Sequence, residues 1–118
     1  MSIVKRRELN ATYYDSYGTV DNDGGSLQLV ANPGTDSYIV VDEGSVSITK
    51  PAYGSDGEVQ IKDTLGNVIR KFNADETKDF PIGKFMVGPN VGLEAIIANA
   101  GNQQAKASIS LSAHITLR

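Results

Sequence analysis

Cysteine and tryptophan are both absent from this chain of 118 residues, and histidine occurs once. Without cysteine there can be no disulfide and no thiolate metal site, so the fold depends on side-chain packing and backbone hydrogen bonds. No run of about eighteen apolar residues occurs, and residues 1–7 carry charge where a signal peptide needs an apolar stretch. We therefore expect a protein that is made in the cytoplasm and neither spans a membrane nor is routed through one.

The residues that are present have the composition of a globular protein. Apolar residues make up 40% of the chain and charged residues 21%, a balance that supports a hydrophobic core in a single domain. Lys5, Arg6, Arg7 and Glu8 give the first eight residues a net charge of +2, which leaves −5 for the remainder of a chain whose total is −3. A mildly acidic body thus follows a basic N-terminal tip.

Apolar and polar residues alternate with a period of two, which is typical of strands that bury one face. The longest alternation covers residues 105–117, and shorter ones cover 45–49 and 58–62. Other short apolar segments are also predicted as strands: 26–30, 38–41, 68–72, 84–87 and 93–97. Turn-forming residues separate these segments at intervals of about eight to twelve residues, which favours a sandwich or barrel. We predict an all-β fold, a single antiparallel β-sandwich.

Three connecting regions are interpreted from their composition. Asp42-Glu43-Gly44 is predicted as a turn, and residues 73–78 as a loop. Residues 1–18 show no clear alternation and are predicted as an N-terminal arm or edge strand. The β-sandwich domain is then expected to span residues 19–118.

Candidate catalytic groups are few. His114 lies on the polar side of the last predicted strand and is interpreted as an exposed strand histidine. The serines available to it, Ser110 and Ser112, share that flat face and offer no cleft with an oxyanion hole. The acidic residues fall almost wholly in predicted turns, which favours solubilising surface charge over an acid–base pair. We predict that the protein is not an enzyme, with no catalytic residue and no cofactor.

Local motifs bear on three kinds of binding: metal, nucleic acid and carbohydrate. The run Asp21–Gly25 resembles half of a calcium loop, but the glutamate that an EF-hand needs at its twelfth position is missing, so a turn without a metal is predicted. Lys5-Arg6-Arg7 is too short a basic run to hold nucleic acid at physiological salt. Tyr38 and Tyr53 lie near predicted turns, where aromatic rings can stack on sugars, so carbohydrate binding stays open.

The C-terminal part resembles that of small bacteriophage structural proteins. The resemblance lies in Gly83–Val87, then Val91–Gly101, then the alternating strand to Arg118, with weaker support from Val59–Ile69. It implies a jelly-roll-like sandwich that binds the outside of a phage capsid as a decoration, or cement, protein. The same resemblance implies a trimer, the major capsid protein as its partner, and the virion as its location.

The contact with the capsid is expected at the N-terminus, where the basic residues would pair with an acidic capsid surface. The predicted contact residues are Val4, Lys5, Arg6, Arg7, Leu9, Tyr13 and Tyr14. No nucleic acid or membrane partner is expected. The alternative function is a tail-fibre, receptor-binding or carbohydrate-binding β-sandwich module.

Overall fold

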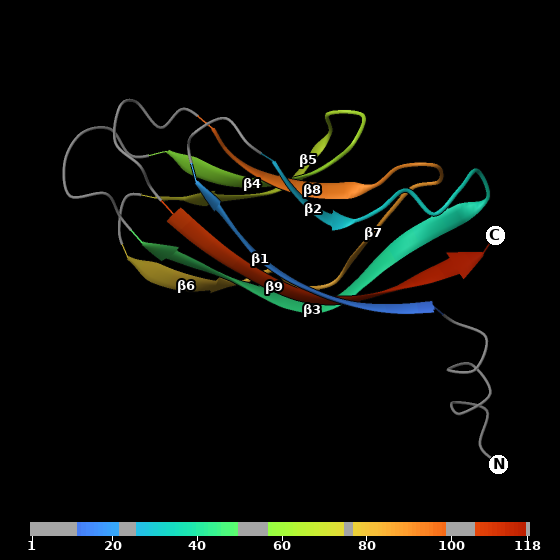
Figure 1. Cartoon of the computed structure of the whole chain (residues 1–118), viewed down its shortest axis with the longest axis horizontal. Coiled ribbons are helices and arrows are strands. Elements are labelled where there is room, and N and C mark those ends of the chain that lie inside the picture. Colours follow the sequence, from blue (N-terminus) through green and yellow to red (C-terminus); the bar gives the residue numbers. More distant parts are fainter. Residues whose placement is uncertain (1–11, 22–25, 50–56, 75–76, 99–105, 118) are drawn as a thin grey trace, which may run out of the picture.

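The computed structural model describes residues 12–21, 26–49, 57–74, 77–98 and 106–117 (Figure 1). These residues form β1 (Thr12–Asp21), β2 (Leu27–Val30), β3 (Ser37–Thr49), β4 (Glu58–Asp63), β5 (Val68–Asn73), β6 (Lys78–Pro81), β7 (Phe85–Val87), β8 (Leu93–Ala98) and β9 (Lys106–Leu117). All pairs among them are antiparallel. The predicted all-β antiparallel fold is confirmed. Nothing in the described ranges is a helix of the length and apolar character that a membrane span requires.

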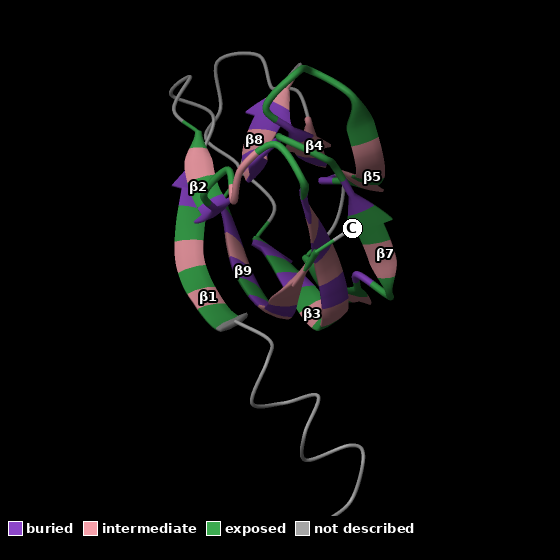
Figure 2. Ribbon diagram, turned by 90° about the vertical axis from the view of Figure 1, so that its right-hand side faces the viewer, coloured by how far each residue is buried: buried purple, intermediate pink, exposed green. Residues whose placement is uncertain are grey.

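Two sheets face each other across the core (Figures 1 and 2). The five-stranded sheet has the order β1-β9-β3-β6, and β7 also pairs with β3. The four-stranded sheet has the order β2-β8-β4-β5. β6 lies opposite residues 45–48 of β3 and β7 opposite residues 39–41, so the two short strands follow one another along β3.

Strand pairing is nested along the chain. β1 pairs with β9, β2 with β8, β3 with β6 and β7, and β4 with its neighbour β5. The chain therefore folds back on itself at the β4–β5 turn, and each later strand returns beside an earlier one. As a result, the first described strand lies against the last.

β3 is a single strand of 13 residues, although the sequence predicted two strands separated by a turn at Asp42-Glu43-Gly44. The turn prediction was wrong because these residues form a β-bulge against β9. Val41 lies opposite Ala113 and Glu43 opposite Ser112, so Asp42 is an extra residue in β3. A polar pair followed by glycine is compatible with a bulge as well as with a turn. A bulge forms here because β9 pairs with β3 on both sides of Asp42.

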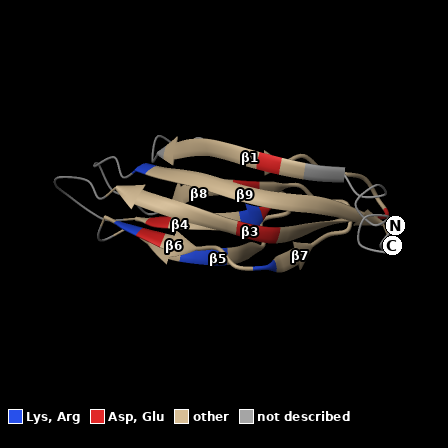
Figure 3. Cartoon of the chain, turned by 90° about the horizontal axis from the view of Figure 1, so that it is seen from below, with Lys and Arg blue, Asp and Glu red and all other residues tan. Residues whose placement is uncertain are grey.

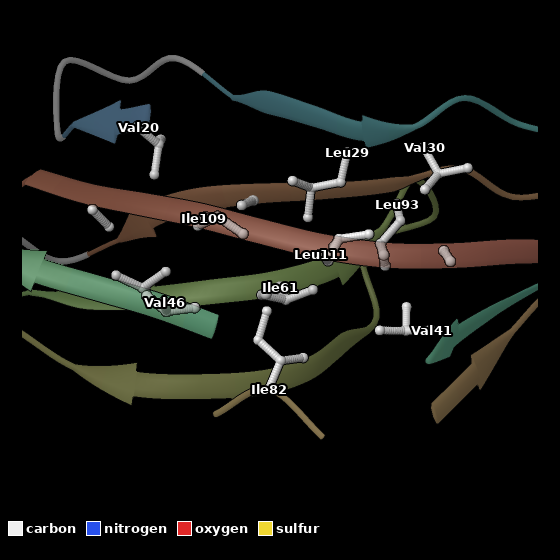
Figure 4. Close-up of a cluster of buried hydrophobic side chains, with 14 of the residues drawn as sticks. Val20, Leu29, Val30, Val41, Val46, Ile61, Ile82, Leu93, Ile109 and Leu111 are labelled. Carbon is white, nitrogen blue, oxygen red and sulfur yellow. The ribbon is translucent and has the colours of Figure 1, made fainter. Parts of the chain in front are cut away.

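The core fills the space between the sheets and follows the predicted alternation (Figure 4). In β9, residues 107, 109, 111 and 113 are buried, while 108, 110 and 112 are half-buried or exposed. Figure 2 shows the same banding on the other long strands. Ile39 and Ile109 from one sheet, and Ile61 and Leu93 from the other, are completely buried. Burial of each such side chain contributes about 1.5–3 kcal/mol to folding.

Polar contacts join the two sheets at both edges of the sandwich. On the β1–β2 side, the Ser16 hydroxyl donates a hydrogen bond to the backbone carbonyl of Leu29. On the β5 side, Nε of Arg70 donates to the carbonyl oxygen of Ile82 at 3.0 Å, and the guanidinium lies 4.8 Å from the centre of the Phe85 ring. These contacts tie the two sheets together at their edges.

Asp63, at the end of β4, organises the β4–β5 turn. Its Oδ1 accepts hydrogen bonds from the backbone N–H groups of Leu65 and Asn67, and its Oδ2 accepts one from Nδ2 of Asn67, each at 2.9 Å. Burial by itself raises the pKa of Asp63, but these hydrogen bonds to the carboxylate outweigh it. The pKa therefore lies below its ordinary value of 3.8.

Replacing Asp63 by Asn is expected to lower the free energy of unfolding by about 1–3 kcal/mol at neutral pH, because an amide nitrogen would then face the Asn67 amide nitrogen. The native carboxylate has the lower pKa in the folded state. Its contribution is therefore complete above the unfolded pKa and is lost as the pH falls through the folded pKa. Urea unfolding at neutral pH and at about pH 2 should show the difference between the two proteins shrinking in acid. A difference that stays constant would contradict this role of the carboxylate.

Candidate functional site

Polar residues gather on the outer face of the five-stranded sheet, around the bulge in β3. In a regular strand, consecutive side chains point to opposite faces. The bulge breaks this rule, because Asp42 and Glu43 both lie on the outer face. Asp42 contacts His114 there, and Glu43 is exposed beside the serines of β9.

His114 and Asp42 form a close pair, with 2.8 Å between Nδ1 of the imidazole and Oδ2 of the carboxylate. Only 15% of the His114 side chain is exposed, so the prediction of an exposed strand histidine was wrong. The bulge is the reason, because it brings Asp42 beside the imidazole. Ser112, two residues before His114, donates its hydroxyl proton to Oδ1 of Asp15 at 2.8 Å. That proton is therefore directed away from His114, which a nucleophile–base pair would not allow.

A shallow depression of about 300 Å³ lies beside the bulge, between β3 and β9. Its lining consists of Glu43, Gly44, Ser45, Ser110, Leu111 and Ser112. β1 runs along the other side of β9, with Tyr17 opposite Ser110 and Asp15 opposite Ser112. The Tyr17 side chain is the most open aromatic group in the described residues, at 75% exposure. Hydroxyls, carboxylates and an aromatic ring thus share one small area.

The charge of this area is negative. Glu43 lines the depression, Asp15 lies opposite Ser112 on β1, and Asp42 precedes Glu43 in β3. Figure 3 shows acidic residues on β1 and β3 of this face. The prediction that acidic residues fall almost wholly in turns was wrong for these three, since all lie within strands. Among the described residues, no group of three or more His, Cys, Asp or Glu side chains is arranged to hold a metal ion.

The predicted contact residues are divided between described and undescribed parts of the chain. Val4, Lys5, Arg6, Arg7 and Leu9 lie outside the described residues, as do residues 22–25 of the weighed calcium loop and Tyr53. Tyr13 pairs with His114 in register, and Tyr14 pairs with Ala113 and is 38% exposed. The expected boundary between residues 18 and 19 falls inside β1, which is an edge strand.

Tyr17, Asp15 and Glu43 are the members of this area that the sequence did not single out as a group. Residues 15, 17 and 19 of β1 do alternate with residues 14, 16, 18 and 20, but two of the inward positions are Ser16 and Gly18. Because these are not apolar, the period of two is hidden. The signal that could have revealed it is the outward set of Asp15, Tyr17 and Thr19, which is acidic, aromatic and hydroxyl-bearing.

Comparison with known proteins assigns no family to the chain. No model of a known protein family and no curated protein matches the sequence.

Proposed function

We propose that this protein is a virion structural protein, which binds the outside of a phage capsid and stabilises the contacts between coat subunits. Two features support the proposal. The nested pairing of β1 with β9, β2 with β8, β3 with β6 and β7, and β4 with β5 is what a jelly-roll-like winding requires. Jelly rolls recur in viral capsid and lectin domains. The C-terminal strands also resemble those of small phage structural proteins, as set out from the sequence.

The observation that carries the proposal is that a basic run precedes, in sequence, a strand that is fully paired at the edge of the sandwich. Lys5, Arg6 and Arg7 lie shortly before Thr12 in sequence, and β1 begins at Thr12. All ten residues of β1 are in register with β9, an inner strand of the five-stranded sheet. Thr12, where β1 begins, is therefore held to β9 by the backbone pairing of the two strands.

The distribution of charge along the chain supports binding through the N-terminus. The first eight residues have a net charge of +2 and the remainder of the chain −5. An acidic coat surface would attract the first part and repel the second, so the protein would approach with its N-terminus foremost. The partner is then the major capsid protein, and the virion surface is the location.

The protein would stabilise the capsid by binding across the contacts between coat subunits. A segment lying across the seam between two coat subunits binds only the assembled shell, and a ligand that binds only one state shifts the equilibrium toward that state. Many copies on one shell add their contributions, and a trimer would bring three basic segments to one place. A modest affinity per copy would then suffice.

The test is binding to empty capsids assembled from the major capsid protein of the same phage. The full-length protein should sediment with these capsids, raise the temperature at which they rupture, and have the mass of a trimer by light scattering before it is added. Capsids of an unrelated phage serve as the control. Absence of co-sedimentation with the cognate capsids, or an unchanged rupture temperature at full occupancy, would refute the proposal.

A further inference from the structure

The depression between β3 and β9 has a lining that suits a ligand rich in hydroxyl groups. Ser45, Ser110 and Ser112 each present a hydroxyl, and Glu43 presents a carboxylate at the rim. A serine hydroxyl can both donate and accept, whereas a carboxylate accepts only. Sugar hydroxyls can also do both, so each lining group would find a complementary partner.

One rim of the depression is already fixed in position. The Ser112 hydroxyl donates to Oδ1 of Asp15 at 2.8 Å, which joins β9 to β1 across the outer face. This bond leaves Oδ2 of Asp15 and the lone pairs of the Ser112 hydroxyl directed toward solvent or a ligand. On the opposite rim, the bulge in β3 holds Glu43 opposite Ser112. Acceptors therefore stand on both sides of the serine row.

Tyr17 adds a ring to this polar area. Its side chain is 75% exposed and lies on the same face as Ser110, its partner in register. Side chains in register on antiparallel strands have Cβ atoms about 5 Å apart, so the ring stands within reach of the depression. An exposed aromatic face beside hydroxyls and carboxylates is an arrangement in which the ring can stack on the C–H face of a sugar.

The negative charge beside the depression favours a neutral sugar over an anionic one. Asp15, Asp42 and Glu43 flank the depression, and the basic residue described on the same strand, Lys106, lies four residues from Ser110, or about 13 Å along an extended strand. These three carboxylates would repel an anionic sugar. A neutral sugar meets no such penalty.

We propose that this area, comprising the lined depression with Asp15 and Tyr17, binds a neutral oligosaccharide. Tyr17 supplies the stacking ring, and the serine row with Glu43 and Asp15 supplies the hydrogen bonds. This binding would be distinct from capsid attachment, because it uses none of the predicted capsid contacts, the last of which along the chain is Tyr14. A protein with both properties would present a glycan-binding face on the particle that carries it.

The test begins with the full-length protein on an array of neutral and anionic glycans, followed by titration of the best neutral probe. Cellohexaose, maltohexaose and mannohexaose represent the neutral class, and oligogalacturonate represents the anionic class. We expect at least one neutral probe to bind and to shift the amide resonances of Tyr17, Ser110 and Ser112. Tyr17→Ala should weaken that binding about tenfold, and Tyr17→Phe should retain it because the ring is kept.

Leu65→Ala is the matched control, since Leu65 is equally exposed, at 76%, but lies in the β4–β5 turn of the other sheet. It should leave the affinity unchanged. The proposal is overturned if no neutral probe binds at millimolar concentration, if oligogalacturonate binds more tightly, or if Tyr17→Ala binds like the native protein. Capsid occupancy of Tyr17→Ala should equal that of the native protein, so failure of either proposal can be recognised separately.

Discussion

Replacing Gly44 by Val is expected to destabilise the sandwich by about 3 kcal/mol or more. A Cβ atom at this position would lie 2.8 Å from the backbone oxygen of Ser110 and 2.9 Å from both Cβ of Leu111 and Cδ1 of Ile82. A backbone oxygen and a core side chain cannot retreat without moving β9 away from β3. Urea unfolding followed by circular dichroism measures the loss.

Ser47→Val is the control for this substitution. Ser47 lies on the same strand and is exposed on the outer face, so added bulk there should change stability by no more than about 0.5 kcal/mol. Gly18 gives a further contrast, since the atoms nearest to a Cβ there belong to the flexible end of Leu27 and can move aside. If Gly44→Val and Ser47→Val lowered the free energy of unfolding equally, the close approach of β3 to β9 at Gly44 would be contradicted.

Reversing the three charges at Lys5, Arg6 and Arg7 to glutamate is expected to raise the dissociation constant for cognate capsids by about 100-fold or more. The reason is that three attractive charge pairs with an acidic coat surface become repulsive. Fold stability should change little, because these residues precede the strands that build the core. Binding is measured by co-sedimentation over a range of protein concentrations, at two salt concentrations.

The matched variant reverses three exposed lysines of the sandwich, Lys71, Lys84 and Lys106. It carries the same change in net charge, so it separates a local effect from general repulsion. Its affinity should fall far less than that of the N-terminal variant. Similar losses for the two variants would mean that total charge, and not the basic segment, governs attachment.

Sequence patterns predicted the strands of the sandwich where one face is strictly apolar. β9 and β4 are the plainest cases, because residues 107, 109, 111 and 113 of β9 and residues 59 and 61 of β4 are buried in the core. β1 was left open between an arm and an edge strand, since its inward residues include Ser16 and Gly18, which pack against β2 at the thin edge of the sandwich. β6 was not predicted as a strand, because it is only four residues long and ends in proline.

The candidate site could not be predicted in the same way, because its members come from three strands far apart in sequence. Asp15 and Ser112 are 97 residues apart, and Asp42 and His114 are 72 apart. Only the pairing of β1 and β3 on either side of β9 brings them together. The bulge in β3 is also a product of that pairing, so the position of Glu43 beside the serine row was not readable from local sequence.

The strand β9 lies beside both β1, which follows the basic segment in sequence, and the depression on the outer face. β9 lies between β1 and β3. It therefore pairs with β1, the strand that follows the basic segment in sequence, and it also lines the depression. The His114–Asp42 pair and the Ser112–Asp15 bond add side-chain links between β9 and its two neighbours.

The most direct measurement of capsid attachment is a cryo-electron microscopy reconstruction of cognate capsids saturated with the full-length protein. The account predicts density for this sandwich on the outer surface of the shell, at seams between coat subunits, with the Thr12 end of β1 facing the coat. Absence of such density, or a sandwich bound through another surface with Thr12 pointing away from the coat, would contradict it.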